Sequence, residues 1–447
     1  MKRIGYKALG LLTAAALLSG CGKGSAPAPE KAGDPSSAKT EAKSDGKTEA
    51  AAEPEVITFW YNNKGDEALP YEEAIKQYNA SQSKYKVEGL SVTDQQKLIV
   101  ALASNESPDI IKGSNSNIIT YQANGLLENL TPYVEKESYD MDMYSTQSVE
   151  ANTIDGQVYA LPISGYSIQL YYNKDILEEI GYKEPPKSME EMYEMAVKAT
   201  TLDANGNIER LGYPLFPLAS ARQELIYGFG GRWWAEDGKT LTPESEGVIE
   251  SLKYNVKYRE QYGVEKVQAF IATANTNRYT EQDMFFAGKQ LFRIDGSWLP
   301  TMMKNFGAEV NYGITLIPSL GGVEEARGVS RFETGSLSIP TTAKNKDGAW
   351  DFIKWITNEE GAKIIDIGVG YLPALKTLYD DPDILAIPGN KEFIEAIKLE
   401  RGIQYPKIKD YAKYVSLIDE YLDYVYNGTK TPEEAMSELA KQAKNLS

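Results

Sequence analysis

The chain changes composition near residue 54, and this change limits which part of it can fold. From Gly22 to about Pro54 it contains no aromatic and no branched aliphatic residue. Such a segment cannot bury enough apolar surface to offset its conformational entropy, so we expect a disordered tether over residues 21–54. The rest, from about Glu55 to Ser447, is longer than one hydrophobic core normally serves, which predicts two lobes.

The residues before the tether predict export from the cytoplasm. A basic start, Met1–Lys7, precedes an apolar run from Ala8 to Leu18 that is too short for a permanent membrane span. The following Ser-Gly-Cys21 completes a resemblance to the bacterial lipoprotein cleavage motif, in which the cysteine becomes the lipid-modified amino terminus. We therefore predict a signal peptide over residues 1–20 and a lipid anchor at Cys21, on the outer face of the cell membrane. The alternative is an incidental cysteine behind an ordinary signal peptide.

The composition argues against several classes of function. A net charge of −17 disfavours nucleic acid as a partner. The chain has no histidine, which excludes a Ser-His-Asp triad and histidine-ligated zinc. Cys21 is the only cysteine, so an intrachain disulfide is excluded. We expect neither a metal nor another cofactor. Tyrosines outnumber phenylalanines 30 to 11, which suits a protein that offers flat amphipathic faces to a wet ligand.

The first part of the folded region predicts strands that alternate with helices. The run Val56–Trp60 is β-branched and aromatic, as in a buried strand. A helix then places four residues on one face, namely Tyr71, Ala74, Ile75 and Tyr78. Next come a strand near Tyr85–Val92, a helix near Gln95–Ala103 and a strand at Asp109–Ile111. This order predicts a parallel sheet flanked by helices.

Later segments carry helix-start signals. Ser188 and Glu191 form a capping box, Asp347 is expected to cap another helix, and Thr431-Pro432 begins the last one. The first of these helices should bury Met189, Met192, Tyr193, Ala196 and Val197, and the second Trp350, Phe352, Ile353 and Ile356. Extended segments are expected at Gln157–Pro162, Ile168–Tyr172 and Val310–Pro318.

Short motifs spread along the folded part carry a family resemblance. They are Ile57–Trp60, Pro108–Ile111, Gly125–Thr131, Asp155–Pro162, Tyr172–Asp175, Pro185–Ser188 with Glu190-Glu191, Gly230-Gly231, Phe286–Lys289, Asp295–Trp298 and Ala349–Ile353. In this order they resemble the carbohydrate-binding branch of the bacterial extracellular solute-binding proteins, the group that includes the maltodextrin-binding protein. The shared order over nearly the whole folded part gives the resemblance its weight.

The resemblance implies an α/β fold of two lobes, each a mostly parallel sheet flanked by helices. Carried over by position, three hinge crossings fall near Gly165, Gly335 and Asp381. The first lobe is then expected to comprise residues 55–165 and 335–380, and the second lobe residues 166–334 and 381–447. A monomer of this kind would capture a sugar, most typically an oligosaccharide, between the lobes. It would deliver the sugar to the membrane subunits of an ABC importer without catalysis.

Sugar contacts are expected on loops at the carboxyl ends of strands, where ligands of α/β sheets bind. The loop after the opening strand offers Asn62 and Asn63, although asparagine is also common in turns. The loop after Ile111 offers Asn115 and Ser116, which could equally cap a helix. In the maltodextrin-binding branch some members carry an aromatic residue and a carboxylate in this second loop. Small polar residues stand there instead, which argues against maltodextrin itself.

Two further loops complete the expected site. Tyr166, at the first hinge, could stack on a sugar or bond to it, and hinge packing is the alternative. Trp298 follows Gly296 and Ser297, and the resemblance implies that its ring lies flat on a sugar. Asp295 is expected beside it as an acceptor for a hydroxyl. Additional candidates are Arg222, Trp233, Arg331 and Tyr371, of which Trp233 could form an exposed platform and Arg331 a surface ion pair.

Two other functions remain open on the sequence. A tethered polysaccharide-degrading enzyme also has an aromatic cleft and needs no histidine, but it needs two carboxylates across the scissile bond. No convincing pair can be picked from the sequence. The same fold could instead bind a peptide, a polyamine or a metal ion. The two arginines, Arg222 and Arg331, leave a ligand that contains uronic acid open.

Overall fold

The computed structural model describes residues 53–104, 106–215 and 219–446, and not the side chains of residues 219–223. The predicted signal peptide, Cys21 and nearly all of the tether lie outside the described residues, as does the side chain of Arg222. None of the helices in the described part combines the length and the apolar character of a membrane span.

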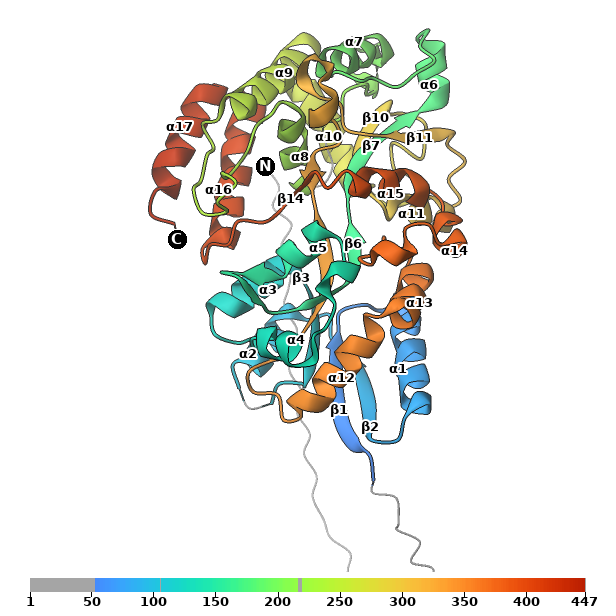
Figure 1. Cartoon of the computed structure of the whole chain (residues 1–447). Helices are drawn as coiled ribbons and strands as arrows, with labels where there is room; N and C mark the ends of the chain where they lie inside the picture. The colour runs from blue at the N-terminus through green and yellow to red at the C-terminus, as the bar shows by residue number, and fades with distance from the viewer. Residues whose placement is uncertain (1–52, 105, 216–218, 447) are drawn as a thin grey trace, which may run out of the picture. The chain divides into compact units, whose positions relative to one another are not determined.

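The first lobe is built on a five-stranded sheet with the order β2-β1-β3-β13-β6 (Figure 1). Its strands are β1 (Glu55–Tyr61), β2 (Tyr85–Ser91), β3 (Ile110–Ser114), β6 (Leu161–Tyr166) and β13 (Glu333–Ser338). β1 runs parallel to β2 and β3, whereas β13 runs antiparallel to β3 and β6. The predicted opening alternation of strands and helices is thereby confirmed.

Helices pack on both faces of this sheet. They are α1 (Leu69–Ser81), α2 (Gln95–Leu102), α3 (Asn115–Ala123), α4 (Thr131–Glu137), α5 (Thr146–Ala151), α12 (Lys346–Ile356) and α13 (Glu359–Val369). The four residues predicted to face inward from α1 are all buried, and so are the four predicted for α12. Phe59 of β1 packs against Tyr71 of α1 and Phe352 of α12, with ring centroids 6.3 and 5.6 Å away. Aromatic contacts therefore join the two helices to the sheet.

The second lobe contains a three-stranded sheet with the order β10-β7-β11. Its strands are β7 (Ile168–Asn173), β10 (Phe292–Gly296) and β11 (Tyr312–Thr315). β10 and β11 both run antiparallel to β7, so the expectation of a mostly parallel sheet is wrong for this lobe. That expectation came from the family resemblance, which implied a mostly parallel sheet in each lobe. Between β7 and β10 lies a long helical excursion that leaves the strand free to return in either direction.

The remaining helices surround the second sheet or follow it in the chain. They are α6 (Lys174–Glu179), α7 (Met189–Ala199), α8 (Ala219–Gly228), α9 (Glu246–Tyr262), α10 (Val264–Thr276), α11 (Leu299–Asn305), α14 (Pro382–Leu385), α15 (Asn390–Lys398), α16 (Tyr411–Tyr426) and α17 (Pro432–Ala443). Three strand pairs of two or three residues lie at β4 (Thr153–Ile154) with β5 (Gln157–Val158), β8 (Thr201–Leu202) with β9 (Ile208–Arg210), and β12 (Ser330–Arg331) with β14 (Gly402–Ile403). The strand expected at Val310–Pro318 is confirmed only over the four residues of β11.

Two of the three predicted helix starts have the expected capping residues. The capping boxes at Ser188 with Glu191 and at Thr431 with Glu434 are both present. The prediction for Asp347 is wrong, because Asn345 caps α12 by accepting a bond from the backbone N–H of Gly348. Asp347 lies in the first turn, where a carboxylate still interacts favourably with the helix dipole.

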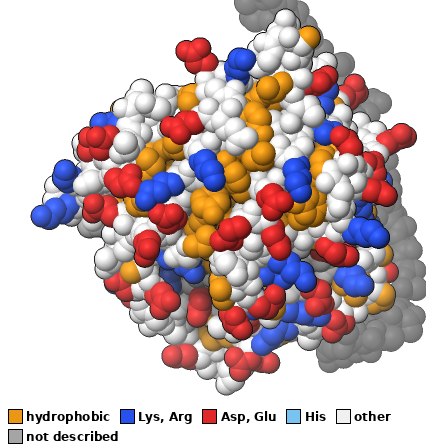
Figure 2. Space-filling model, turned by 90° about the horizontal axis from the view of Figure 1, so that it is seen from above, with side chains coloured by type: hydrophobic (Ala, Val, Ile, Leu, Met, Phe, Trp, Pro, Cys, Tyr) orange, Lys and Arg blue, Asp and Glu red, His pale blue; other side chains and the backbone are white. Residues whose placement is uncertain are grey.

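The chain passes directly from the first sheet to the second between Tyr166, the end of β6, and Ile168, the start of β7. It returns to the first sheet at Glu333, where β13 begins beside Tyr166. The residues of the functional site gather at these two crossings. Seen from above, acidic and basic side chains are interspersed over one face of the molecule, with apolar patches between them (Figure 2). The negative net charge is therefore not concentrated in one region of that face.

Candidate ligand-binding site

A pocket of about 200 Å³ lies where strands of both sheets end. Its lining residues are Asn62, Lys112, Gly113, Ser114, Tyr166, Trp298, Glu333, Thr334 and Gly335. Hydroxyl, amide, charged and aromatic groups meet there, which is the mixture that a polyhydroxylated ligand needs. Its volume lies below the ~300–1,000 Å³ of typical small-molecule sites, so the pocket as it stands holds a small ligand or one unit of a longer one.

The sheet topology explains why these residues meet. β1 and β3 are parallel neighbours, so the loops at their carboxyl ends, which carry Asn62 and Ser114, emerge at the same edge. β13 is antiparallel to β3 and therefore brings its amino end, Glu333 to Gly335, to that edge. Gly335 leaves room for this approach, because a Cβ there would lie 2.5 Å from the Ser164 hydroxyl and 3.2 Å from that of Tyr166.

Trp298 reaches the pocket from the second lobe, directly after β10. Its ring lies over Gly296, where a Cβ would come within 2.1 Å of the indole. Gly296 therefore makes room for the tryptophan ring. Trp298 is half-buried, so one part of the ring is fixed by packing and another is free to contact a ligand.

A hydrogen bond fixes the orientation of the indole. Trp298 Nε1 donates to the hydroxyl of Tyr279 over 2.7 Å, and that hydroxyl donates to Asp295 Oδ1 over 2.8 Å. Burial, followed by the nearby Asp295 carboxylate, raises the pKa of Tyr279 to about 12, so the hydroxyl keeps its proton. Tyr279 has a positive φ of 51°, a costly conformation for a bulky residue. The structure maintains this strain at the residue that holds Trp298.

Asp295 belongs to a buried ionic cluster rather than to the pocket wall. Its Oδ2 lies 2.7 Å from Arg293 Nη2, and Arg293 Nη1 lies 2.7 Å from Asp283 Oδ1. All three side chains are at most 3% exposed. The expectation that Asp295 accepts a ligand hydroxyl is wrong, because both its oxygens are already engaged by Arg293, Tyr279 and the N–H of Gly296. Its role is to position Trp298 through Tyr279.

Lys112 brings an ammonium group to the first-lobe side of the pocket. The side chain is 5% exposed, and its Nζ donates to Asn62 Oδ1 over 3.0 Å. Nζ also lies 5.6 Å from the ring centroid of Tyr71 and 6.0 Å from that of Tyr371. Burial lowers the pKa of Lys112 to about 8, and nearby Glu67 opposes this shift.

Glu333 also lines the pocket and belongs to a second ionic group. Its Oε1 lies 3.4 Å from Arg331 Nε and accepts a bond from the hydroxyl of Tyr405. Arg331 Nε also lies 3.2 Å from Glu224 Oε1. Burial raises the pKa of Glu224 to about 7, although Arg331 opposes the shift. The expectation of a surface ion pair at Arg331 is wrong, because the side chain is 6% exposed and faces carboxylates instead of the pocket.

Several predicted residues lie behind the pocket wall. The amide Nδ2 of Asn63 donates to the hydroxyl of Tyr371 over 3.0 Å, and Tyr371 packs edge-on against Tyr166 with centroids 4.9 Å apart. Asn115 is buried, and its Oδ1 accepts a bond from the N–H of Thr334 over 3.4 Å. None of Asn63, Tyr371 and Asn115 lines the pocket, and their contact with a ligand is not supported by this geometry.

Two further predicted residues, Ser116 and Trp233, also lie outside the pocket lining. The hydroxyl of Ser116 bonds to that of Ser114 over 2.8 Å, and Ser114 lines the pocket whereas Ser116 does not. The exposed platform expected at Trp233 is wrong, because the side chain is fully buried in a core with residues of α16 and α17. Two glycines before a tryptophan suggested an open loop, and the tertiary packing outweighs that local signal. Of the predicted contacts, Asn62, Tyr166 and Trp298 reach the pocket together.

Sequence reasoning missed Lys112, Ser114 and the Glu333–Gly335 segment as pocket residues. A lysine directly behind the apolar pair Ile110-Ile111 of a buried strand was the one available signal. For Glu333 and its neighbours the signal was the hinge crossing that the resemblance places near Gly335, and the antiparallel pairing of β13 brings this segment to the edge of the sheet.

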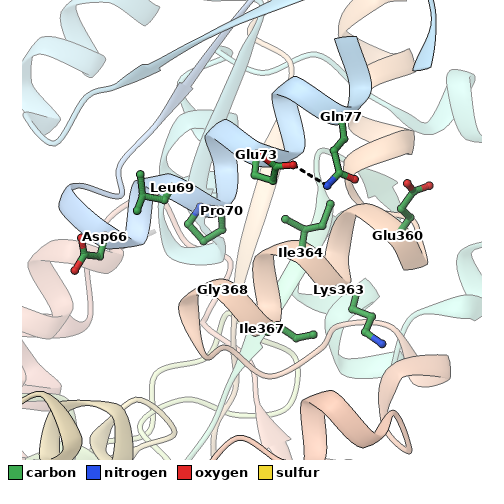
Figure 3. A pocket seen from close by; sticks show the side chains of 10 residues that line it. All are labelled: Asp66, Leu69, Pro70, Glu73, Gln77, Glu360, Lys363, Ile364, Ile367 and Gly368. Atoms are coloured by element: carbon green, nitrogen blue, oxygen red, sulfur yellow. Dashed lines mark hydrogen bonds between the residues drawn. The ribbon is translucent and has the colours of Figure 1, made fainter. Parts of the chain in front are cut away.

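A larger hollow of about 780 Å³ lies elsewhere, between α1 and α13 (Figure 3). Leu69, Pro70, Ile364 and Ile367 give it an apolar surface, and Glu73 accepts a bond from Gln77 at its edge. All its residues belong to the first lobe, and its exposed surface is mostly apolar, although charged side chains such as Glu360 and Lys363 also line it. Over the described ranges, no three Asp, Glu, His or Cys side chains gather as metal ligands would.

Comparisons with known proteins agree with this architecture. The family model of the bacterial extracellular solute-binding proteins matches residues 73–392. A maltotriose-binding protein of Pyrococcus abyssi is 25% identical over 76% of this chain and 71% of its own length. A galactooligosaccharide-binding protein of Bacillus subtilis is 26% identical over 75% of this chain and 76% of its own.

Solved structures share the fold at lower identity. The sugar-binding protein MalE of Xanthomonas citri superposes with a TM-score of 0.73 at 21% identity, covering 87% of this chain and 96% of its own. The structure of CpMnBP1 with mannotriose bound gives a TM-score of 0.72 at 22% identity, covering 87% of this chain and all of its own. These likenesses support the two-lobe α/β fold.

Proposed function

Because this chain belongs to the bacterial extracellular solute-binding proteins, we propose that it captures a sugar and delivers it to an ABC importer. The ligand would bind in the pocket between Asn62, Tyr166 and Trp298. Two relatives are named for maltotriose and galactooligosaccharide, which favours an oligosaccharide. The observation that carries the proposal is Trp298, which has a hydrogen-bonded indole at the mouth of a pocket lined by hydroxyl and amide groups.

The pocket favours binding over catalysis. Glu333 is the only carboxylate among its lining residues. Glycoside hydrolysis ordinarily uses two carboxyl groups on opposite sides of the scissile bond. Binding also explains why the lining residues come from both lobes. A ligand that contacts both lobes stabilises their closed arrangement by the contacts that it makes only there.

A screen for ligand-induced stabilisation tests this function. The chain from residue 21 onward, with Cys21→Ser to prevent lipidation, is heated with maltotriose, galacto-, manno- and uronate-containing oligosaccharides. A bound sugar at 100 times its Kd should stabilise the protein by about 2.7 kcal/mol and raise Tm. Each sugar that does so is recovered and analysed by mass spectrometry, and we expect it intact. Shortened products would mean an enzyme, and no stabilisation by any sugar would contradict the proposal.

The proposal includes a location and an assembly state. The family is extracellular, and a lipid anchor at Cys21 behind a 34-residue tether (21–54) would keep the protein beside its importer. We propose lobes at residues 55–165 with 335–380, and 166–334 with 381–447. We also propose that the protein acts as a monomer.

The anchor is tested by expressing the full chain and its Cys21→Ser variant in a bacterial host. We expect the unaltered chain in the membrane fraction and in the detergent phase of a phase partition, because dual acylation anchors a protein stably. The variant should be released into the aqueous phase at equal expression. Equal partition of both proteins would contradict lipidation at Cys21.

A further inference from the structure

The pocket is lined by two charged residues, Lys112 and Glu333, and they differ in their partners. Among the described residues, the Lys112 ammonium makes one hydrogen bond, to Asn62 Oδ1, and no ion pair. It is 5% exposed, so water compensates little of its charge. An ammonium group has three donors, and here two of them lack a hydrogen-bond partner among the described side chains. A desolvated cation of this kind lines the pocket with no carboxylate of the described residues within ion-pair distance, and only the more distant charge of Glu67 opposes the lowering of its pKa.

Burial of such a group costs free energy unless a partner compensates for the lost water. The lowered pKa of Lys112, about 8, reflects this cost. A neutral ligand that fills the pocket would exclude more water and leave the charge unbalanced. A ligand carboxylate would supply the missing counter-ion and accept the free donors in charge-assisted bonds, which are roughly twice as strong as neutral ones.

Glu333, the carboxylate among the lining residues, differs from Lys112 because it already has partners. Glu333 already has Arg331 as a partner and a bond from the hydroxyl of Tyr405. It lies on β13 four residues from Leu337, the residue that pairs with Lys112 in β3, and no ion pair joins Glu333 to Lys112. A ligand can therefore place a negative group at Lys112 and a hydroxyl donor at Glu333.

We propose that the bound saccharide carries a carboxylate, as a uronic acid does, and that Lys112 selects it. This inference rests on the proposed function and names the substrate class of the same pocket. Lys112 acts here as the specificity-determining residue, while Trp298 contacts the sugar ring.

The test compares two ligands and two proteins. Binding of di- and trigalacturonate and of the neutral galacto-oligosaccharides of equal length is measured by titration calorimetry on the chain from residue 21 with Cys21→Ser. We expect tighter binding of the uronate. Lys112→Met should weaken the uronate on the order of tenfold or more, as loss of a charged hydrogen bond does. It should weaken the neutral sugars less than the uronate, and Lys112→Arg should restore much of the uronate preference.

A pH series on the unaltered protein tests the same point without depending on a stable variant. The groups around the ammonium are Glu67, Tyr71, Tyr166, Tyr371 and Glu333. Burial raises the pKa values of Tyr71, Tyr166 and Tyr371, so these hydroxyls stay neutral between pH 7 and 9. Only Lys112 should lose its charge there, and uronate affinity should fall about tenfold at pH 9 while neutral-sugar affinity stays constant.

Each outcome decides the inference. Neutral sugars that bind as well as uronates, or a Lys112→Met variant that weakens both equally, would overturn the selection of a carboxylate and leave the proposed function intact. Tighter binding of glucose 6-phosphate than of any uronate would overturn the carboxylate in favour of a phosphate ester. Failure of every sugar to bind would overturn the proposed function itself.

Discussion

Trp298→Ala is expected to weaken sugar binding by about 2 kcal/mol or more, because an aromatic anchor at the centre of a pocket carries a large share of binding energy. The indole is held by Tyr279 over 2.7 Å and supported by Gly296, so its orientation is set before a ligand arrives. Titration calorimetry with the sugar that most raises Tm measures the loss. Far-ultraviolet circular dichroism establishes that the variant is folded.

Trp298→Phe provides the matched comparison. It keeps an aromatic face and removes the Nε1 donor, so we expect an intermediate loss of affinity. Tyr279→Phe removes the hydroxyl that accepts the indole N–H and leaves Trp298 in place. A loss in this variant as well would show that orientation contributes. An affinity of Trp298→Ala within about twofold of the unaltered protein would rule out stacking at this residue.

Arg293→Met is expected to lower the free energy of unfolding by about 3–5 kcal/mol, the usual cost of removing one partner from a buried ion pair. Two carboxylates depend on this guanidinium, Asp283 and Asp295, and both would be left buried without their cation. Urea denaturation followed by circular dichroism measures the change.

Lys86→Met is the control for this loss. Lys86 pairs with Glu88 over 2.7 Å, but both side chains are about half exposed, and such pairs contribute about 0–1 kcal/mol. We expect little change in this variant. Equal stabilities of Arg293→Met and the unaltered protein would contradict the role given to the buried cluster. A stable Arg293→Met protein with weaker sugar binding would instead place its role in orienting Trp298 alone.

The sequence predicts the first lobe better than the second for a physical reason. Local patterns determine β1, α1 and α12, because strand propensity and helical periodicity act over a few residues. The direction of β10 and β11 depends on how a long helical excursion returns to β7, and no local pattern records that. The correction at Asn345, two residues before the predicted cap Asp347, shows that helix starts are also uncertain by a residue or two.

The same distinction between local pattern and distant packing applies to the residues of the site. Asn62, Tyr166 and Trp298 follow strands directly, and their places in the pocket follow from the strand ends. Asp295 stands three residues before Trp298 and has the right chemistry, yet its partners Arg293 and Asp283 draw it into the interior. Trp233 was misplaced because its burial depends on α16 and α17, about 180 residues further along the chain. Side-chain partners that are distant in sequence decide which candidates reach the ligand.

The most direct test of sugar capture is a crystal structure of the protein with the oligosaccharide that most raises its Tm. We expect one intact sugar unit in the pocket, with its C–H face on the Trp298 indole and hydroxyls within hydrogen-bond distance of Asn62. Sugar density between α1 and α13, or a bound sugar that leaves Trp298 and Asn62 without contacts, would contradict this expectation.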